Sequence, residues 1–472
     1  HFLARIQSMR IPAWLTPHIQ RAQSASRPVM TWVKAHPRRA SLLALVILGF
    51  VSRFWLFGYP NQAVFDEVYF GKFASAYYTH SYFFDIHPPL GKLLIAGFVW
   101  FFGFNPTQSF ATIGTTYNDD GYLFLRFLPS LASALLPAIF YLLGRELKLK
   151  QRTALLLGLA VLLENGLITQ GRFILIDSFL ILFGFASLAA WLAWRRSHKR
   201  HWLILTALLA GASVSVKWTG LIFLALILFV EVTTAPRFMT LIKRIFVLLS
   251  VSFLVYFSSF VIHFSLLTKT GDGDAFHTPA FQKTLHGSQY EADDTIKPLN
   301  LPQKFLELNY QMFAANQRLT AGHPYGSHWY TWPIMQRPIA YWVLNENQIW
   351  LFGNPIVWWG STCGVIALVV TLVRRKVSKA QSFGTRLVLF GFFASWLPFA
   401  AITRVMFLYH YFIPLGFAIL CTGYALDKQS LRVQQYCATA ILLGFCMVFP
   451  FTYGTASNLL FTYIRSLIPT WR

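Results

Sequence analysis

The sequence predicts an all-α polytopic membrane protein with about eleven transmembrane helices, an N-terminus inside and a C-terminus outside. Hydrophobic residues make up 56% of the 472 residues, and charged residues only 12%. That charged share is about half of what a soluble domain carries. Several apolar stretches approach the ~20 residues that a helix needs to cross a bilayer. A soluble globular fold is therefore excluded.

Basic clusters in short connectors predict the orientation of these helices. The net charge is +23, and Lys and Arg recur at 145–152, 195–200, 237–244 and 374–379, each between two apolar runs. Cytoplasmic loops of membrane proteins carry such an excess of Lys and Arg. The charge therefore sets topology and contacts anionic lipid head groups of the bilayer, and no nucleic-acid partner is expected.

The spans follow in order once these connectors are held inside. They are expected at about 41–58, 122–144, 153–169, 173–194, 202–216, 219–235, 244–266, 354–373, 386–402, 407–426 and 434–453. The apolar run 90–104 is short, and counting it as a span would place the cluster at 145–152 outside. We expect it to lie in the membrane interface.

Three regions are predicted along the chain. Residues 1–40 form a basic cytoplasmic arm, residues 41–454 form the membrane-embedded domain, and residues 455–472 form an outer tail. The membrane domain carries two long outer loops, 59–121 with interfacial helices and 267–352.

Two adjacent carboxylates follow the first span, in the segment Phe65-Asp66-Glu67-Val68-Tyr69-Phe70-Gly71-Lys72. Neighbouring side chains at a helix start point about 100° apart. One carboxylate can therefore face a reaction as a base while the other pairs with a cation. The alternative is a purely structural role, in which the two carboxylates form a negatively charged first turn that the helix dipole stabilises. The catalytic candidates are Asp66 and Glu67.

Four cations lie at the outer ends of predicted spans: Arg126, Arg172, Lys217 and Arg404. Ionisable groups at such positions are costly and point to function by default. Together they would suit a phosphate head group, although snorkelling toward the interface is the alternative for each. Asp177 is expected to pair with a nearby cation such as Arg172.

Two motifs carry a specific family resemblance: the Asp66–Glu67 segment above, and His87-Pro88-Pro89-Leu90-Gly91-Lys92. Weaker matches follow in order at 125–129, 172–178, 213–220, 323–338, 353–359 and 410–414. Over about residues 41–454 the chain resembles the protein O-mannosyltransferase family.

The resemblance implies a GT-C fold and an inverting transfer of mannose from polyprenyl-phosphate-mannose to Ser or Thr hydroxyls of exported proteins. It makes Asp66 the candidate base. The 267–352 loop lacks room for the β-trefoil domain of eukaryotic members, which implies a bacterial form. The expected location is the cytoplasmic (inner) membrane, with the active site on the outer face and coupling to the secretion channel as an option.

The remaining site candidates are assigned to substrate binding. They are His87, Lys92, Arg126, Arg172, Asp177, Lys217, His323, Trp329, Arg404 and His410. For His87 the alternative is orientation of the Pro-Pro turn, and for Trp329 an interface-belt anchor. No metal site and no certain cofactor are predicted; a divalent ion held by side chains assembled in space stays open.

Two rival functions remain at this point. The same fold would also suit transfer of a sugar to a lipid or cell-wall glycan. A transporter or flippase for a lipid-linked sugar is the second alternative. Transporters usually show internal repeats and broken helices at the membrane midplane. This chain shows no internal repeat, which favours the enzyme.

Overall fold

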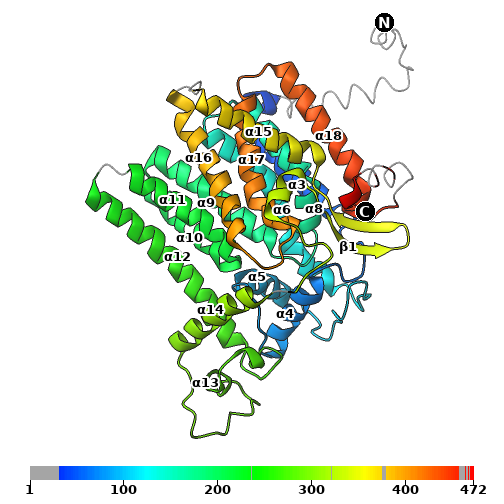
Figure 1. The fold of residues 1–472 in the computed structure, drawn as a ribbon, viewed down its shortest axis with the longest axis vertical. Helices are drawn as coiled ribbons and strands as arrows, with labels where there is room; N and C mark the ends of the chain where they lie inside the picture. The colour runs from blue at the N-terminus through cyan, green and yellow to red at the C-terminus, as the bar shows by residue number, and fades with distance from the viewer. Residues whose placement is uncertain are drawn as a thin grey trace.

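The computed structural model describes residues 31–234, 237–319, 321–374, 379–456, 463, 466 and 468–471. Most of the predicted N-terminal arm and most of the predicted outer tail lie outside these residues. The described chain is a bundle of helices with one end elaborated by two long connecting segments (Figure 1).

The α-helices are α3 (Pro37–Phe54), α4 (Glu67–Thr79), α5 (Leu90–Val99), α6 (Gly121–Glu146), α7 (Gln151–Leu162), α8 (Asn165–Gly171), α9 (Asp177–Ser197), α10 (Arg200–Val216), α11 (Leu221–Thr234), α12 (Phe238–Leu266), α13 (Pro279–Gln282), α14 (Leu301–Arg318), α15 (Pro355–Val373), α16 (Lys379–Trp396), α17 (Phe412–Leu426) and α18 (Leu431–Tyr453). Short 3₁₀ turns include η1 (Trp100–Phe102), η2 (Trp218–Gly220), η4 (Trp329–Ile334), η5 (Leu397–Ala401) and η6 (Leu408–Tyr411). The strands are β1 (Ile339–Leu344) and β2 (Asn347–Leu351).

Every predicted span falls on one of these helices or on a broken pair. Among the described residues, seven helices are long and apolar enough to cross a membrane, or eight if α7 and α8 form one span bent by 54°. This confirms a multi-pass helical membrane protein. The helices α3, α10 and α11 are too charged or too short for that criterion, so the count of eleven and the orientation stay predictions.

Glu164 explains the bend between α7 and α8. It is the N-cap of α8 and accepts a hydrogen bond from the Leu167 amide at 2.6 Å. Its other oxygen accepts from the Asn354 amide at 2.8 Å, at the start of α15. One fully buried carboxylate thus satisfies donors from two helix starts, as a helix end inside a protein requires.

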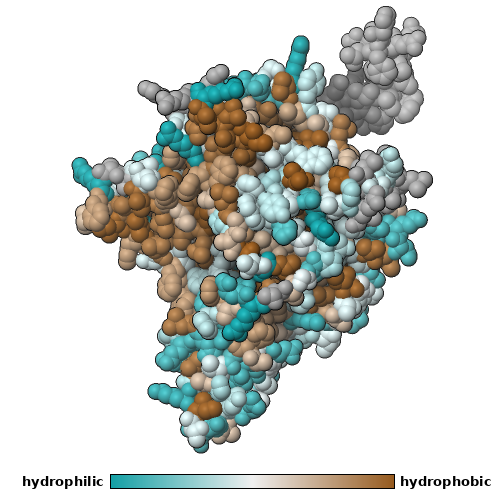
Figure 2. All heavy atoms as spheres, viewed as in Figure 1, coloured by the Kyte–Doolittle hydropathy of each residue, from teal (hydrophilic) through white to brown (hydrophobic). Residues whose placement is uncertain are grey.

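The centre of the bundle is α6, which packs against α3, α7 and α9, while α10 joins α9 to α12 (Figure 1). The helices α3 and α6 approach each other so closely at Gly49 that a larger residue would not fit there. A Cβ at Gly49 in α3 would lie 2.1 Å from the Ala134 carbonyl oxygen of α6. The outer face of α12 exposes large apolar side chains such as Phe246 and Phe253. Figure 2 shows this apolar surface over α11 and α12, and hydrophilic side chains toward α13.

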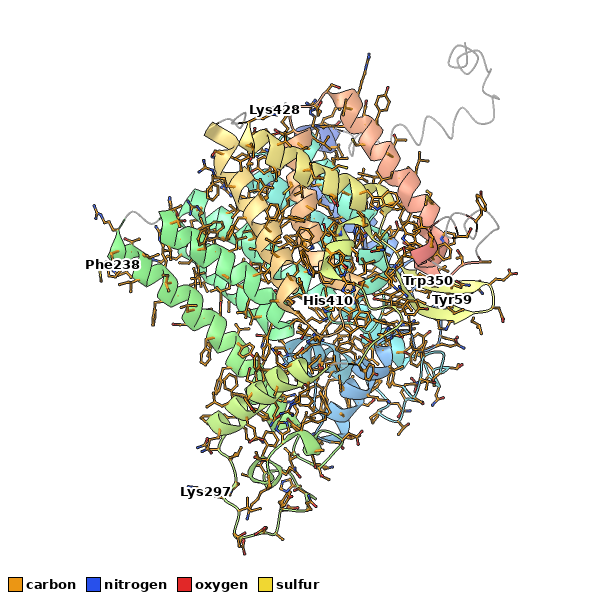
Figure 3. All side chains as sticks on the ribbon, viewed as in Figure 1. Tyr59, Phe238, Lys297, Trp350, His410 and Lys428 are labelled. Atoms are coloured by element: carbon orange, nitrogen blue, oxygen red, sulfur yellow. The ribbon has the colours of Figure 1, made fainter. Side chains whose placement is uncertain are left out.

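The two long connecting segments pack together at one end of the bundle. In Figure 3 Lys297, between α13 and α14, lies far from Phe238 and Lys428, and His410 lies between these extremes. The antiparallel hairpin of β1 and β2 touches the start of α4: the Phe65 amide donates to the Tyr341 carbonyl at 3.0 Å, and the two rings stack at 4.0 Å. The hairpin therefore fixes the residue before Asp66.

Candidate active site

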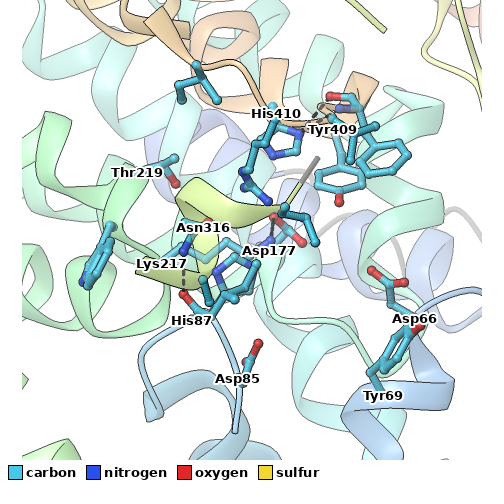
Figure 4. Close-up of a pocket in the computed structure, with 18 of the residues that line it drawn as sticks. Asp66, Tyr69, Asp85, His87, Asp177, Lys217, Thr219, Asn316, Tyr409 and His410 are labelled. Carbon is cyan, nitrogen blue, oxygen red and sulfur yellow. Dashed lines mark hydrogen bonds and ion pairs between the residues drawn. The ribbon is translucent and has the colours of Figure 1, made fainter. Parts of the chain in front are cut away.

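A cavity of about 1120 Å³ lies where these segments meet the helix ends. Its walls come from the start of α4, the loop at 84–87, η2, the end of α14 and the segment 399–413. Asp66, Asp85, His87, Asp177 and Lys217 gather around this hollow (Figure 4). Residues far apart in the sequence therefore form one polar site.

Asp66 lines the cavity from the N-cap position of α4. Its carboxylate makes no capping hydrogen bond, and within the described chain no hydrogen-bond partner for it is recorded. Burial raises the pKa of Asp66 to about 7; Lys217 opposes this shift, and Asp177 and Asp85 add to it. A carboxylate that is half protonated near neutral pH and free of partners suits a general base.

Asp177 and Lys217 form a buried ion pair in the cavity wall. The Lys217 Nζ lies 2.8 Å from Asp177 Oδ1, and the other oxygen of Asp177 accepts from Gln170 Nε2 at 2.8 Å. The Lys217 Nζ also lies 5.3 Å from the centre of the Tyr409 ring. The partner of Asp177 is thus Lys217 and not Arg172, which corrects the expected pairing.

Glu67, the neighbour of Asp66, points away from the cavity into the protein. It is fully buried and forms a two-pronged ion pair with Arg126, at 2.7 Å to Nε and 2.8 Å to Nη2. It also accepts hydrogen bonds from the Val64 and Ile174 amides and from Tyr117 Oη, at 2.8–2.9 Å. These bonds give Glu67 a positioning role, holding the start of α4, instead of the catalytic role expected for it.

Arg126 and Arg172 are also removed from the expected phosphate site, because both guanidinium groups are buried outside the cavity lining. Besides Glu67, Arg126 donates to the Pro60 and Gln62 carbonyls at 2.8 and 3.0 Å. Arg172 donates to the Thr452, Trp55 and Leu56 carbonyls at 2.7–3.0 Å. Both arginines tie loops to helix ends.

Lys92 likewise has a structural role, because it stabilises the loop at 84–87 beside the cavity. It forms a buried ion pair with Asp85, and its Nζ donates to the His87 carbonyl at 2.8 Å. This contact holds Asp85 and His87 at the cavity, which Lys92 itself does not line. Burial, with Lys217 and Lys92 nearby, lowers the pKa of His87 well below its usual range. The imidazole of His87 is therefore neutral at pH 7.

Arg404, His410 and His323 line the cavity from its other side. Arg404 is half-buried, and within the described part of the chain no carboxylate lies at ion-pair distance from it. His410 Nδ1 is bound to the backbone of Phe407, at 3.0–3.1 Å. Trp329 lies outside the lining and packs against Trp396, with ring centres 5.1 Å apart.

The cavity also contains residues that the sequence analysis did not single out. These are Tyr69, Asp85, Asn316, Arg318 and Tyr409. Asp85 lies two residues before the His87 motif, and Tyr409 one residue before His410, so their neighbours gave a signal. Asn316 had none, because only the fold brings the end of α14 over the cavity. In the described ranges no group of three or more His, Cys, Asp or Glu is placed to hold a metal ion.

Two family models match the chain. "Dolichyl-phosphate-mannose-protein mannosyltransferase" matches residues 43–268, and "C-terminal four TMM region of protein-O-mannosyltransferase" matches residues 301–471. The sequence is 35% identical to protein O-mannosyltransferase 1 of Drosophila melanogaster, over 52% of this chain and 30% of the fly protein. It is 30% identical to protein O-mannosyl-transferase 2 of Danio rerio, over 66% of this chain and 43% of the fish protein. The chain thus spans less than half the length of these relatives.

The fold resembles that of several solved structures, including the following two. A chain of the S. cerevisiae protein O-mannosyltransferase Pmt1-Pmt2 complex bound to the sugar donor matches with a TM-score of 0.83 and 21% identity, covering 90% of this chain and 91% of that chain. The Archaeoglobus fulgidus oligosaccharyltransferase matches with a TM-score of 0.53 and 12% identity, covering 92% and 58%. These likenesses confirm the predicted GT-C type of fold.

Proposed function

Because this chain belongs to the protein O-mannosyltransferase family, we propose that it transfers mannose from a polyprenyl-phosphate-mannose donor to Ser or Thr hydroxyls of exported proteins. The observation that carries the proposal is the Asp66 carboxylate, for which the described residues supply no hydrogen-bond partner, in a cavity that Lys217 and Arg404 also line. A base and a basic phosphate site are the two parts that such a transfer needs.

In the proposed reaction, Asp66 takes the proton of the acceptor hydroxyl. The hydroxyl oxygen then bonds to the anomeric carbon of mannose while the bond from that carbon to the carrier phosphate breaks. Attack from the face opposite the leaving phosphate inverts the anomeric centre. Lys217 and Arg404 are proposed to hold the charge that grows on the phosphate, because charge-assisted hydrogen bonds are the strong ones.

The remaining lining residues have supporting roles in this proposal. His87 is neutral and can accept or donate one hydrogen bond to a sugar hydroxyl. Asp177 orients Lys217 through their 2.8 Å contact. His323 and His410 line the side of the cavity where Arg404 lies and are assigned to binding the donor or the acceptor. We propose that this site lies on the outer face of the membrane, as the basic connectors predict. The short 267–352 loop supports a bacterial form of the family and therefore an inner-membrane location.

The direct test is transfer by the purified full chain in a membrane mimetic. We expect a Ser/Thr-rich exported peptide, offered with polyprenyl-phosphate-mannose, to gain the mass of one hexose in mass spectrometry. Reactions with a lipid acceptor and with a cell-wall glycan run in parallel. Hexose transfer to one of those acceptors alone would replace the protein acceptor, and donor movement across vesicles without transfer would support the transporter.

Loss of the Arg404 guanidinium should weaken donor use. We expect Arg404→Ala to raise the donor KM or lower the rate by roughly tenfold to a hundredfold, because a charged contact to phosphate is worth ~1–3 kcal/mol. Arg404→Lys should recover only part of this, since the planar fork is lost.

A matched control for that measurement is Arg337→Ala, which removes an exposed cation of the 267–352 segment that does not line the cavity. Acceptor-peptide KM should change little in either variant. A donor KM for Arg404→Ala equal to that of Arg337→Ala would remove Arg404 from the phosphate site and leave the role of Asp66 untouched.

A further inference from the structure

We propose that a second cavity, at the opposite end of the bundle, binds the head group of an anionic glycerophospholipid. The cavity has a volume of about 820 Å³ and lies between the start of α3, the ends of α6 and α9, and α16. Six cations and one acid line it: Arg38, Arg39, Arg145, Lys148, Arg195, Arg196 and Glu146. The proposal goes beyond the proposed transferase function and does not depend on it.

The surrounding elements converge tightly enough to make one site. The Tyr141 hydroxyl of α6 donates to the Arg38 carbonyl at 3.5 Å, which joins α6 to the start of α3. The ends of α6 and α9 are joined by the 2.9 Å ion pair between Glu146 and Arg196. Arg195 of α9 lies 4.9 Å from the ring centre of Phe383 in α16.

Most of the positive charge at this site is uncompensated. Arg196 pairs with Glu146 at 2.9 Å, and Arg195 pairs with Glu231 at 3.3 Å. Among the described residues, no carboxylate lies at ion-pair distance from the other four cations. Arg38 and Arg39 also lie in the first turn of α3, where the helix dipole disfavours cations. An anion bound in the cavity would compensate the unpaired positive charge, and it would offset the unfavourable interaction of Arg38 and Arg39 with the helix dipole.

The position of the cavity selects a lipid as the source of that anion. Asp177 at the catalytic cavity and Arg195 at the second cavity are 18 residues apart on α9, which is roughly 27 Å along a helix. The hydrocarbon core of a bilayer is about 30 Å thick, so the second cavity lies at the opposite interface.

The lining of the cavity agrees with this assignment. Leu42, Leu142, Leu192 and Phe383 supply apolar walls beside the cations. A phosphodiester would meet the cations, while the first carbons of the acyl chains meet the apolar side chains. Basic pockets between transmembrane helices bind acidic head groups in this manner.

Native mass spectrometry of the full chain in detergent, titrated with cardiolipin, tests the proposal. We expect the wild-type chain to retain one cardiolipin and no phosphatidylcholine. Arg39→Gln/Lys148→Gln, which alters two exposed cations of the cavity, should need at least about tenfold more cardiolipin for the same occupancy, a loss of ~1.4 kcal/mol. Lys199→Gln/Arg200→Gln is the matched control, because it removes the same charge from exposed residues outside the cavity.

Three results would overturn the proposal. Unchanged occupancy in Arg39→Gln/Lys148→Gln would show that the cavity is not the binding site. Equal losses in this variant and in the control would show general attraction to basic connectors. Displacement of cardiolipin by an excess of inorganic phosphate would identify a small-anion site in place of a lipid site. Unfolding temperatures of both variants confirm that the folded chains are compared.

Discussion

Asp66→Asn is expected to abolish most mannosyl transfer while leaving the protein folded. The amide has nearly the size of the carboxylate but cannot take the proton of the acceptor hydroxyl. Loss of a well-placed general base costs on the order of 10²–10⁴-fold in rate. Single-turnover transfer with saturating donor measures this loss, and donor binding should be preserved.

The pH dependence separates the base from a structural carboxylate. Because burial raises the pKa of Asp66 to about 7 and the proposed base acts when deprotonated, kcat/KM of the wild-type chain should rise with pH up to about 7 and then level off. The raised pKa of Asp66 also makes the stability of the fold depend on pH. A carboxyl with a raised folded-state pKa stabilises the fold when protonated, and this stability is lost as pH rises from about 4 through 7.

Asp66→Asn should therefore unfold at a temperature similar to the wild-type chain at pH 4 and at a higher temperature at pH 8. Improved stability at pH 8 together with lost turnover is the pattern of a residue held for chemistry. Wild-type turnover in folded Asp66→Asn would remove Asp66 as the base. A loss of stability at every pH would instead make it a structural residue.

The largest stability effect is expected for Arg126→Ala. This change leaves the Glu67 carboxylate buried without its cation and also leaves the Pro60 and Gln62 carbonyls without a donor. Breaking a buried ion pair by removing one partner costs ~3–5 kcal/mol. We expect a clearly lower unfolding temperature and a low yield of folded protein in detergent.

Arg404→Ala is the comparison for this measurement, since Arg404 has no carboxylate at ion-pair distance in the described chain and its loss should change stability little. Folded Arg126→Ala should also retain a near-normal donor KM. If Arg126→Ala were as stable as Arg404→Ala and showed a raised donor KM, Arg126 would contact the carrier after all, and the positioning role of Glu67 would be wrong.

The sequence predicted the helical architecture well because apolarity and length decide which segments enter a membrane. The predicted ranges 122–144 and 244–266 fall within α6 and α12. Side-chain direction was harder to predict. Arg126 and Arg404 both occupy span ends, yet one is sealed inside with Glu67 and the other lines a cavity. Position along a span does not reveal which face a side chain occupies when the helix is buried on most sides.

The adjacent carboxylates Asp66 and Glu67 also show how far side-chain direction can be predicted from sequence. Helix geometry required Asp66 and Glu67 to point in different directions, and they do. Which of them meets the cavity depends on Arg126, Tyr117 and the Ile174 amide, which come from distant parts of the chain. Local sequence alone therefore predicted a division of roles, but the tertiary contacts determine its assignment.

The composition of the cavity wall has a consequence for the order in which the protein is made. Asp66, Asp177 and Lys217 belong to the first half of the chain, whereas Arg404 and His410 follow α16. During synthesis the proposed base and its lysine neighbour are inserted long before the arginine arrives. A nascent chain that has not yet reached Arg404 and His410 therefore lacks one side of the pocket. We therefore expect the proposed sugar transfer to begin only after α16 and the segment that follows it have been made.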